Sequence, residues 1–123
     1  MALVSSWDDP QISTTITAGG SPYTLINVFT TKEGQQQAFC DAQIGEYRRL
    51  AGKFPGQLTI NLHKGRDGRK VVNYAQFVDE DAYRAWRESD EFVEHMAIIE
   101  PFLDKVEPGF YEVAYIQHAP PTD

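Results

Sequence analysis

The chain has 123 residues, of which 41% are hydrophobic and 24% charged, and this is the size and balance of one ordinary globular domain. Its formal net charge of −7 argues against a nucleic-acid partner, because phosphate binding depends on clustered Lys and Arg. No apolar run could cross a membrane, the N-terminal residues lack signal-peptide features, and Cys40 is alone, so we expect a cytoplasmic protein with a reduced thiol.

Both ends of the chain are expected to lie outside the folded domain. Residues 1–21 are rich in Ser, Thr, Gly and Pro and predict an N-terminal arm, in which Ile12–Thr17 alternates enough to add an edge strand. Residues 118–123 contain two adjacent prolines and predict a frayed C-terminal tail. The domain itself is therefore expected over residues 22–117.

The first half of this domain predicts a strand, a helix and a second strand. Tyr23–Thr31 is rich in β-branched and aromatic residues, which favour a strand. Lys32–Ala51 has apolar residues near helical spacing, and Gly52 suits the C-terminus of that helix. Leu58–His63 alternates strictly between apolar and polar residues and predicts a strand, which a glycine-rich turn at residues 65–68 connects to the next one.

The second half predicts a returning strand, a broken helical region and a last strand. Val71–Val78 forms the returning strand, and Asp79 is placed to cap a helix that follows it. Ser89 starts a further helical segment, which Pro101 interrupts. A Pro-Gly pair then opens the last strand, Phe110–Gln117.

This element order, β-α-β-β-α-β, predicts a ferredoxin-like α+β fold. Helices would cover one face of the sheet, while the strands carry apolar side chains on both faces. A second copy of the chain is the natural cover for the other face, so we expect a homodimer.

Several common catalytic patterns are absent from the sequence. The three histidines, His63, His95 and His118, show no metal-ligand spacing with one another or with Cys40. There is also no phosphate-binding glycine loop and no nucleophile elbow. The sequence therefore predicts no metal site and no nucleotide cofactor.

Two amides stand inside strands, where Asn is disfavoured. Asn27 shares a strand face with Phe29, and Asn73 shares one with Phe77. Burying an unpaired amide costs roughly 1–3 kcal/mol, so each needs a partner. That partner is either a neighbouring backbone group or water, or the two amides converge to hold a phenolate or carbonyl oxygen of a ligand.

The other candidate residues have ordinary structural explanations. Tyr83 and Trp86, three residues apart, suit packing of a helix on the sheet. His63 ends an alternating strand and can be exposed, and His95 on an acidic helix can be solvated or salt-linked. These residues alone predict an α+β domain with a candidate polar pocket.

Three segments of the chain resemble the antibiotic biosynthesis monooxygenase family. They are Val71–Phe77, Asp81–Arg84, and a WxxSxxFxxH pattern from Trp86 to His95. The likeness is greatest to the small quinone-forming and anthrone oxygenases of aromatic polyketide pathways, and it covers about residues 23–117. These motifs identify the superfamily well and the substrate poorly.

The resemblance implies a dimeric α/β barrel with a cavity between the sheet and the helices of each subunit. It also implies oxygenation by O2 without metal, haem or flavin. The substrate would be a small aromatic phenol or anthrone, whose anion passes an electron to O2. The recombined peroxide would then collapse to a quinone, in a site that favours the anion and excludes water.

The resemblance also suggests catalytic residues. Asn73 and Tyr83 match positions that contact substrate oxygens, Asn27 matches a first-strand Asn, and His63 matches a strand histidine near the pocket. The implied roles are stabilisation of the anion by the two amides and acid–base or peroxide donation by Tyr83. His63 would be a base, since the ordinary pKa of histidine suits that role.

Substrate packing is implied for four further residues: Phe29, Phe77, Trp86 and His95. Phe77 departs from the close relatives, which have Trp at this position. An indole N–H could donate a hydrogen bond to substrate or peroxide, and a phenyl ring cannot. Phe77 therefore keeps only a stacking role.

Three other functions are compatible with this fold. Haem-degrading members use an Asn, Trp and His set, which Asn27 and Trp86 fit. His95, however, stands one residue before the ligand position, which Met96 occupies, and one residue is about 100° of rotation on a helix. A non-enzymatic barrel would bind a small molecule without O2 uptake, and an aldolase or isomerase would turn over without O2.

Overall fold

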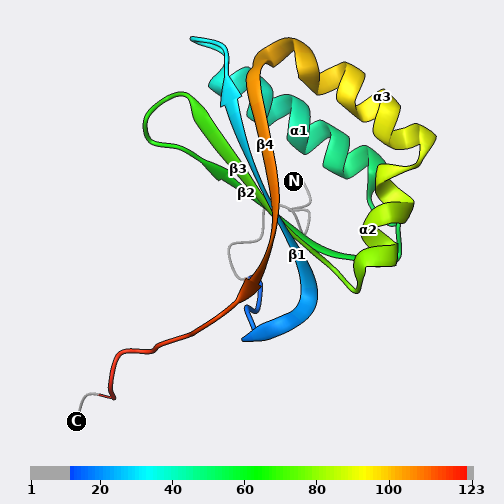
Figure 1. Cartoon of the computed structure of the whole chain (residues 1–123). Helices are drawn as coiled ribbons and strands as arrows, with labels where there is room; N and C mark the ends of the chain where they lie inside the picture. The colour runs from blue at the N-terminus through cyan, green and yellow to red at the C-terminus, as the bar shows by residue number, and fades with distance from the viewer. Residues whose placement is uncertain (1–11, 122–123) are drawn as a thin grey trace, which may run out of the picture.

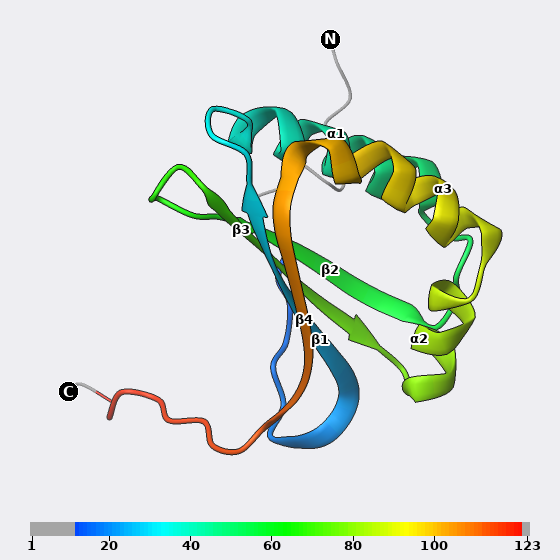
Figure 2. The same ribbon diagram turned by 45° about the horizontal axis from the view of Figure 1, so that its top comes forward.

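A computed structural model of the chain describes residues 12–121, which form a four-stranded antiparallel sheet with helices packed on one face (Figure 1, Figure 2). The sheet order is β2-β3-β1-β4. In chain order the elements are β1 (Gly19–Thr31), α1 (Gln36–Leu50), β2 (Gln57–Lys64), β3 (Lys70–Phe77), α2 (Glu80–Arg87), α3 (Asp90–Ile99), a 3₁₀ turn η1 (Glu100–Phe102) and β4 (Leu103–Val113). The predicted ferredoxin-like α+β fold is confirmed.

The two predicted helix starts after β3 are confirmed by their caps. The side chains of Asp79 and Ser89 each accept a hydrogen bond from the backbone N–H three residues later, at 2.8 and 3.1 Å. The first helix, α1, begins four residues later than Lys32, where the sequence predicted it. The reason is local, because Gly34 has a φ of 77°, outside the helical region, and the N–H of Gln35 closes a turn by donating to the carbonyl of Lys32 at 3.0 Å.

The last strand begins seven residues earlier than the prediction of Phe110–Gln117, so that prediction is wrong at both ends. Pro108 was taken as a strand opener, but it lies inside β4, paired with Asn27 of β1. Proline is tolerated there because β4 is an edge strand, where a missing N–H need not break the ladder.

The segment before the sheet does not add an edge strand, contrary to the prediction for Ile12–Thr17. Instead it contacts side chains of β2 and β3. The amide of Gln76 donates to the carbonyl of Thr15 at 2.9 Å, and the hydroxyl of Thr14 donates to Asn61. The segment is thus held by side-chain hydrogen bonds. The N-terminal arm was predicted over residues 1–21, but β1 already starts at Gly19.

The helix-facing side of the sheet carries the apolar core in two clusters. One cluster joins β1, α1, β3 and α3 and consists of Phe29, Phe39, Cys40, Val71 and Ile99. The other joins β1 and β3 and consists of Leu25, Ala75 and Phe77. Polar side chains of the helix-facing side lie between these two clusters, so the apolar core is divided rather than continuous.

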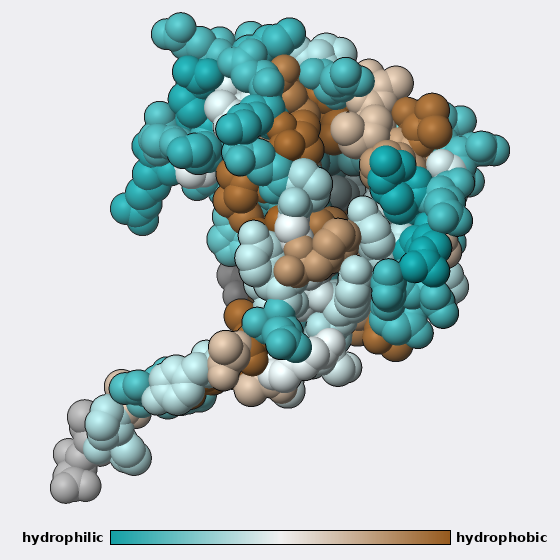
Figure 3. All heavy atoms as spheres, viewed as in Figure 1, coloured by the Kyte–Doolittle hydropathy of each residue, from teal (hydrophilic) through white to brown (hydrophobic). Residues whose placement is uncertain are grey.

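The opposite side of the sheet carries apolar side chains that are only half-buried, among them Ile26, Val28, Val72 and Tyr74. We call this side the outer face. The surface in Figure 3 shows apolar patches along β4. Val106 and Phe110 of this strand are exposed, but they pair with Phe29 and Leu25 and so belong to the helix-facing side. Within residues 12–121, none of the helices has the length and apolarity needed to cross a bilayer.

Candidate active site

A cavity of about 270 Å³ lies between the sheet and the helices. Its walls come from all four strands and all three α-helices and are mostly apolar and aromatic. The lining residues used below are Asn27, Phe29, Gln43, Tyr47, Asn73, Phe77, Tyr83, Trp86, Arg87, Phe92, His95 and Met96. This size and composition are typical of a site for a small, flat organic molecule.

Four polar side chains on the wall of this cavity each have a buried oxygen with no hydrogen-bond partner in the described chain. The four atoms are Asn27 Oδ1, Gln43 Oε1, the Tyr47 hydroxyl and Asn73 Oδ1. Leaving such a group unsatisfied costs about 1–3 kcal/mol, so four in one place are unusual in a folded core. The arrangement indicates that a ligand with polar groups completes these hydrogen bonds.

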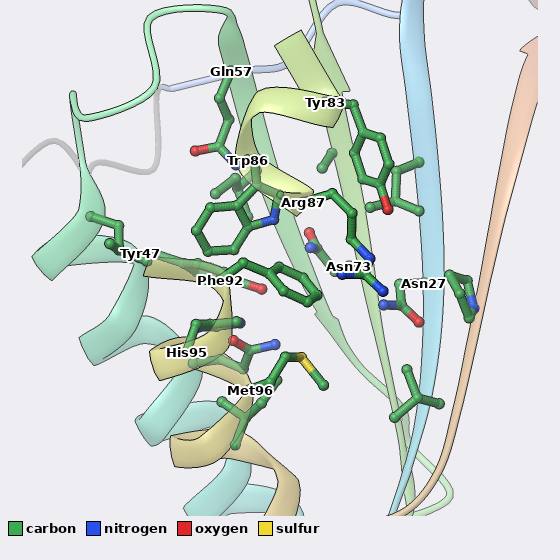
Figure 4. Close-up of a pocket in the computed structure, with 18 of the residues that line it drawn as sticks. Asn27, Tyr47, Gln57, Asn73, Tyr83, Trp86, Arg87, Phe92, His95 and Met96 are labelled. Carbon is green, nitrogen blue, oxygen red and sulfur yellow. The ribbon is translucent and has the colours of Figure 1, made fainter. Parts of the chain in front are cut away.

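The two strand amides face each other across the ladder. Asn27 and Asn73 are directly paired residues of the antiparallel strands β1 and β3. Figure 4 shows them on the strand side of the cavity, with Tyr47, His95 and Met96 on the helix side. An amide can present either its oxygen or its NH2 group, so this pair can bind a neutral hydroxyl or an anionic oxygen.

On the helix side, His95 is held against a buried carboxylate. Its Nδ1 lies 3.2 Å from Oε1 of Glu46, and the two residues are only 6% and 5% exposed. Both carboxylate oxygens of Glu46 also accept hydrogen bonds from Arg49, at 2.8 Å each. Arg49 is the main cause that lowers the pKa of Glu46, so this side chain stays ionised.

Aromatic rings fix the plane of the His95 imidazole. Trp86 lies edge-on to it at a centroid distance of 5.4 Å, and Tyr47 stacks at 6.5 Å. Desolvation lowers the pKa of His95, although the hydrogen bond to Glu46 opposes the effect. At neutral pH the ring is therefore uncharged, with one nitrogen protonated and the other free to accept.

Tyr83 approaches the cavity from α2 and is packed by other rings. It lies edge-on to Phe77 at 5.4 Å and to Phe110 at 4.8 Å. Burial raises the pKa of its phenol. Its hydroxyl therefore remains protonated and can donate a hydrogen bond to a bound oxygen.

Arg87, also from α2, brings a positive charge to the cavity. Its guanidinium lies over the ring of Phe92, 4.5 Å from the centroid. None of the carboxylates in residues 12–121 forms an ion pair with it. Figure 4 shows the side chain reaching from α2 toward Asn73, so an anionic substrate would meet a cation at this end of the cavity.

Seven of the eight residues proposed from the sequence line this one cavity: Asn27, Phe29, Asn73, Phe77, Tyr83, Trp86 and His95. His63 does not. It is exposed and pairs with Val72, whereas its neighbour Leu62 pairs with Asn73. Because strand side chains alternate, His63 lies on the outer face, and its assignment as a base beside the pocket is wrong for this chain.

Sequence reasoning missed Gln43, Glu46 and Tyr47, all from α1. Gln43 and Glu46 belong to a buried stripe of that helix in which polar residues share the spacing of apolar ones, and Tyr47 lies beside it, half-buried. The stripe consists of Gln36, Phe39, Cys40, Gln43, Glu46 and Leu50. Polar residues at core positions of an amphipathic helix were the available signal. Nothing in the sequence marked Arg87 as a site residue, because a charged residue on a short helix is ordinarily exposed to solvent.

The family model of antibiotic biosynthesis monooxygenases matches residues 22–98, which is more than half of the chain. The chain belongs to this family. It is 30% identical over 101 residues to tetracenomycin-F1 monooxygenase from Streptomyces glaucescens, covering 82% of this chain and 89% of the relative. The predicted enzyme class, a monooxygenase, is thereby confirmed.

Solved structures agree with the fold. SnoaB, a cofactor-independent oxygenase from Streptomyces nogalater, superposes with a TM-score of 0.66 at 25% identity, over 80% of this chain and 97% of that one. Rv0793 from Mycobacterium tuberculosis gives a TM-score of 0.64 at 18% identity, over 81% and 100%. The ferredoxin-like unit is thus common to these proteins and to this monooxygenase-family chain.

Proposed function

We propose that this protein is a cofactor-independent monooxygenase that oxidises a phenolic or anthrone-type, polyketide-like aromatic with O2 to a quinone. The observation that carries the proposal is the set of four unpaired buried oxygens inside a cavity walled by aromatic rings. An apolar wall suits a flat ring system, the unpaired amide oxygens can accept hydrogen bonds from its hydroxyl groups, and the Tyr47 hydroxyl can donate to a carbonyl oxygen. The tetracenomycin-F1 relative supports the aromatic substrate class.

The reaction needs no redox group from the protein, because the substrate supplies the electrons. Loss of a proton gives an anion, which transfers one electron to O2, and the two radicals combine to a peroxide. The peroxide takes back a proton, and loss of the C–H proton with cleavage of the O–O bond then releases water and leaves a new carbonyl group. One oxygen atom thus enters the product, and the other leaves as water.

The cavity residues suit distinct parts of this sequence. The NH2 groups of Asn27 and Asn73 would donate to the anionic oxygen in a place shielded from water. The Tyr83 hydroxyl would donate to the peroxide. Phe77 and Trp86 would hold the aromatic plane, because Phe77 offers a stacking surface without a hydrogen bond.

We further propose that a second copy of the chain covers the outer face. Ile26, Val28, Val72 and Tyr74 leave this face apolar and only half-buried, although helices cover the other side of the same sheet. Apolar surface in the middle of a sheet favours association. A symmetric pair would bury it on both copies at once.

Turnover tests the proposed reaction directly. Purified protein is treated with chelator and mixed with anthrone or a naphthol while O2 uptake and quinone absorbance are recorded. Asn73→Leu should lower kcat by about 10²-fold, as expected for loss of one group that stabilises a developing anion. It should not destabilise the protein, since the Asn73 oxygen has no partner to lose.

Asn61→Leu is a matched control, because Asn61 is a strand amide on the outer face. Its amide donates to the carbonyl of Tyr74 at 3.0 Å, so the variant should lose stability and keep turnover. Ligand binding without O2 uptake across these substrates would sink the proposal in favour of a binding protein. Turnover without O2 would indicate an aldolase or isomerase, and a Soret band after incubation with haem would indicate a haem-degrading enzyme.

A further inference from the structure

The proposed reaction begins with removal of a proton, and the residue suggested for this step from the sequence lies on the wrong face of the sheet. Among residues 12–121, the side chains on the cavity wall that can titrate are Tyr47, Tyr83, Arg87 and His95. Burial raises the pKa of both tyrosines, and arginine stays protonated. His95 is therefore the group left to accept a proton near neutral pH.

We propose that His95 is the general base of the site and that Glu46 positions it. This inference rests on the proposed function, since it names the residue that starts that reaction. Glu46 is an ionised carboxylate and can only accept, so the hydrogen bond at 3.2 Å requires a proton on Nδ1 of His95. The lone pair of the neutral ring is then on Nε2.

Nε2 is available to a ligand. No hydrogen bond joins it to any residue of the described chain, while His95 lines the cavity and Glu46 does not. The ring edge that bears Nδ1 is turned to Glu46 on α1, which leaves the Nε2 side to the cavity. Figure 4 shows His95 on the helix side of the cavity, across from Asn73 on the strand side.

The arrangement is built to keep this tautomer and orientation. Arg49 binds both oxygens of Glu46 and fixes the carboxylate, and Trp86 and Tyr47 fix the plane of the ring. A carboxylate that orients a histidine and stabilises its protonated form is the logic of a catalytic dyad. A substrate bound between Nε2 and the two strand amides would lose its proton to His95 while the amides receive the anion.

The charged and titratable groups around His95 come from two helices. Glu46, Tyr47 and Arg49 face it from α1, and Arg87 and Tyr83 reach the same cavity from α2. The strands contribute neutral amides. When His95 accepts the proton, Glu46 balances the new charge and Arg49 opposes it, so the proton can be released again after the anion has reacted.

The test compares two histidines in the intact protein. His95→Gln should lower kcat by roughly 10²-fold or more, the usual contribution of a general base. His63→Gln, an equal change on the outer face, should keep wild-type turnover. Activity of His95→Gln should recover at alkaline pH, where the substrate ionises by itself, and a merely structural role of His95 would give no such recovery.

Glu46→Gln gives a second, independent readout. A neutral amide keeps the shape but removes the charge that raises the pKa of His95, so the acidic limb of the kcat/KM profile should move to lower pH. The kcat should fall on the order of tenfold, because about one unit in the pKa of His95 corresponds to a factor of ten in proton affinity. Glu46→Asp should restore part of it.

Binding of para-nitrophenol separates this inference from the proposed function, because its phenolate is visible by absorbance without any turnover. The wild type should bind the phenolate at a pH where the free phenol is protonated, and His95→Gln should bind the phenol unionised. Equal ionisation in both proteins, or equal kcat and pH profile, would overturn the role of His95. Absence of O2 uptake by the wild type would instead refute the proposed oxygenation.

Discussion

Tyr47→Phe is the sharpest test of the view that the cavity contains polar groups in need of a ligand. The Tyr47 hydroxyl is buried and has no hydrogen-bond partner in the described chain, and burial raises the pKa of this phenol so that it stays neutral. An unsatisfied buried oxygen destabilises the folded protein by about 1–3 kcal/mol. Removing it while keeping the ring should therefore increase the free energy of unfolding by part of that amount. We expect the unliganded variant to be more stable than the wild type by ~1 kcal/mol.

For a domain of this size that gain corresponds to a rise in Tm of about 3–5 °C. The assay is thermal and urea unfolding of both proteins, alone and with a saturating naphthol. The ligand should stabilise the wild type more than the variant, because only the wild type recovers a hydrogen bond. Tyr111→Phe, at an exposed tyrosine, should change neither value. A variant that is less stable than the wild type, or an equal ligand effect in both, would refute the reasoning.

Two more predictions concern the pH dependence of stability and the association of two chains through the outer face. The pKa of His95 in the folded protein is below its ordinary value of 6.5. Just below that pH the histidine takes up a proton in the unfolded chain and not in the folded one, which favours unfolding. The urea midpoint should therefore fall as the pH drops from about 6.5. Glu46, whose pKa is lowered from 4.5, should add a second loss below that value, and His95→Gln should remove the first loss alone. Light scattering should give twice the 13.9 kDa chain mass for the wild type and one chain for Val28→Lys on the outer face. Val93→Lys, at an exposed position of α3, should remain a dimer, and a monomeric wild type would contradict the covered sheet.

The fold was predictable because its signals are local. Strict alternation in β2 and the side-chain caps at Asp79 and Ser89 each depend on a few neighbouring residues, and the structure contains them all. The position of β4 was not predictable in the same way. Pro108 breaks a strand by local rules, and only its place at the edge of the finished sheet makes it acceptable.

The strand amides of the site were predictable, and the contribution of helix α1 was not. Asn27 and Asn73 are conspicuous because a polar residue is rare on an apolar strand face. Glu46 is an ordinary residue for a helix, and its burial depends on how α1 packs against α3. His63 could have been excluded from the sequence alone, because its strand places Leu62, and not the histidine, on the cavity side.

The direct pairing of Asn27 with Asn73 makes the site sensitive to strand register. Inserting or deleting one residue within β1, between Tyr23 and Asn27, would turn the first amide to the outer face and leave the second unopposed. The turn at residues 65–68 could change length without such an effect, since β3 would keep its own pairing with β1. Homologues of this chain should therefore vary in length at that turn and not inside the two central strands.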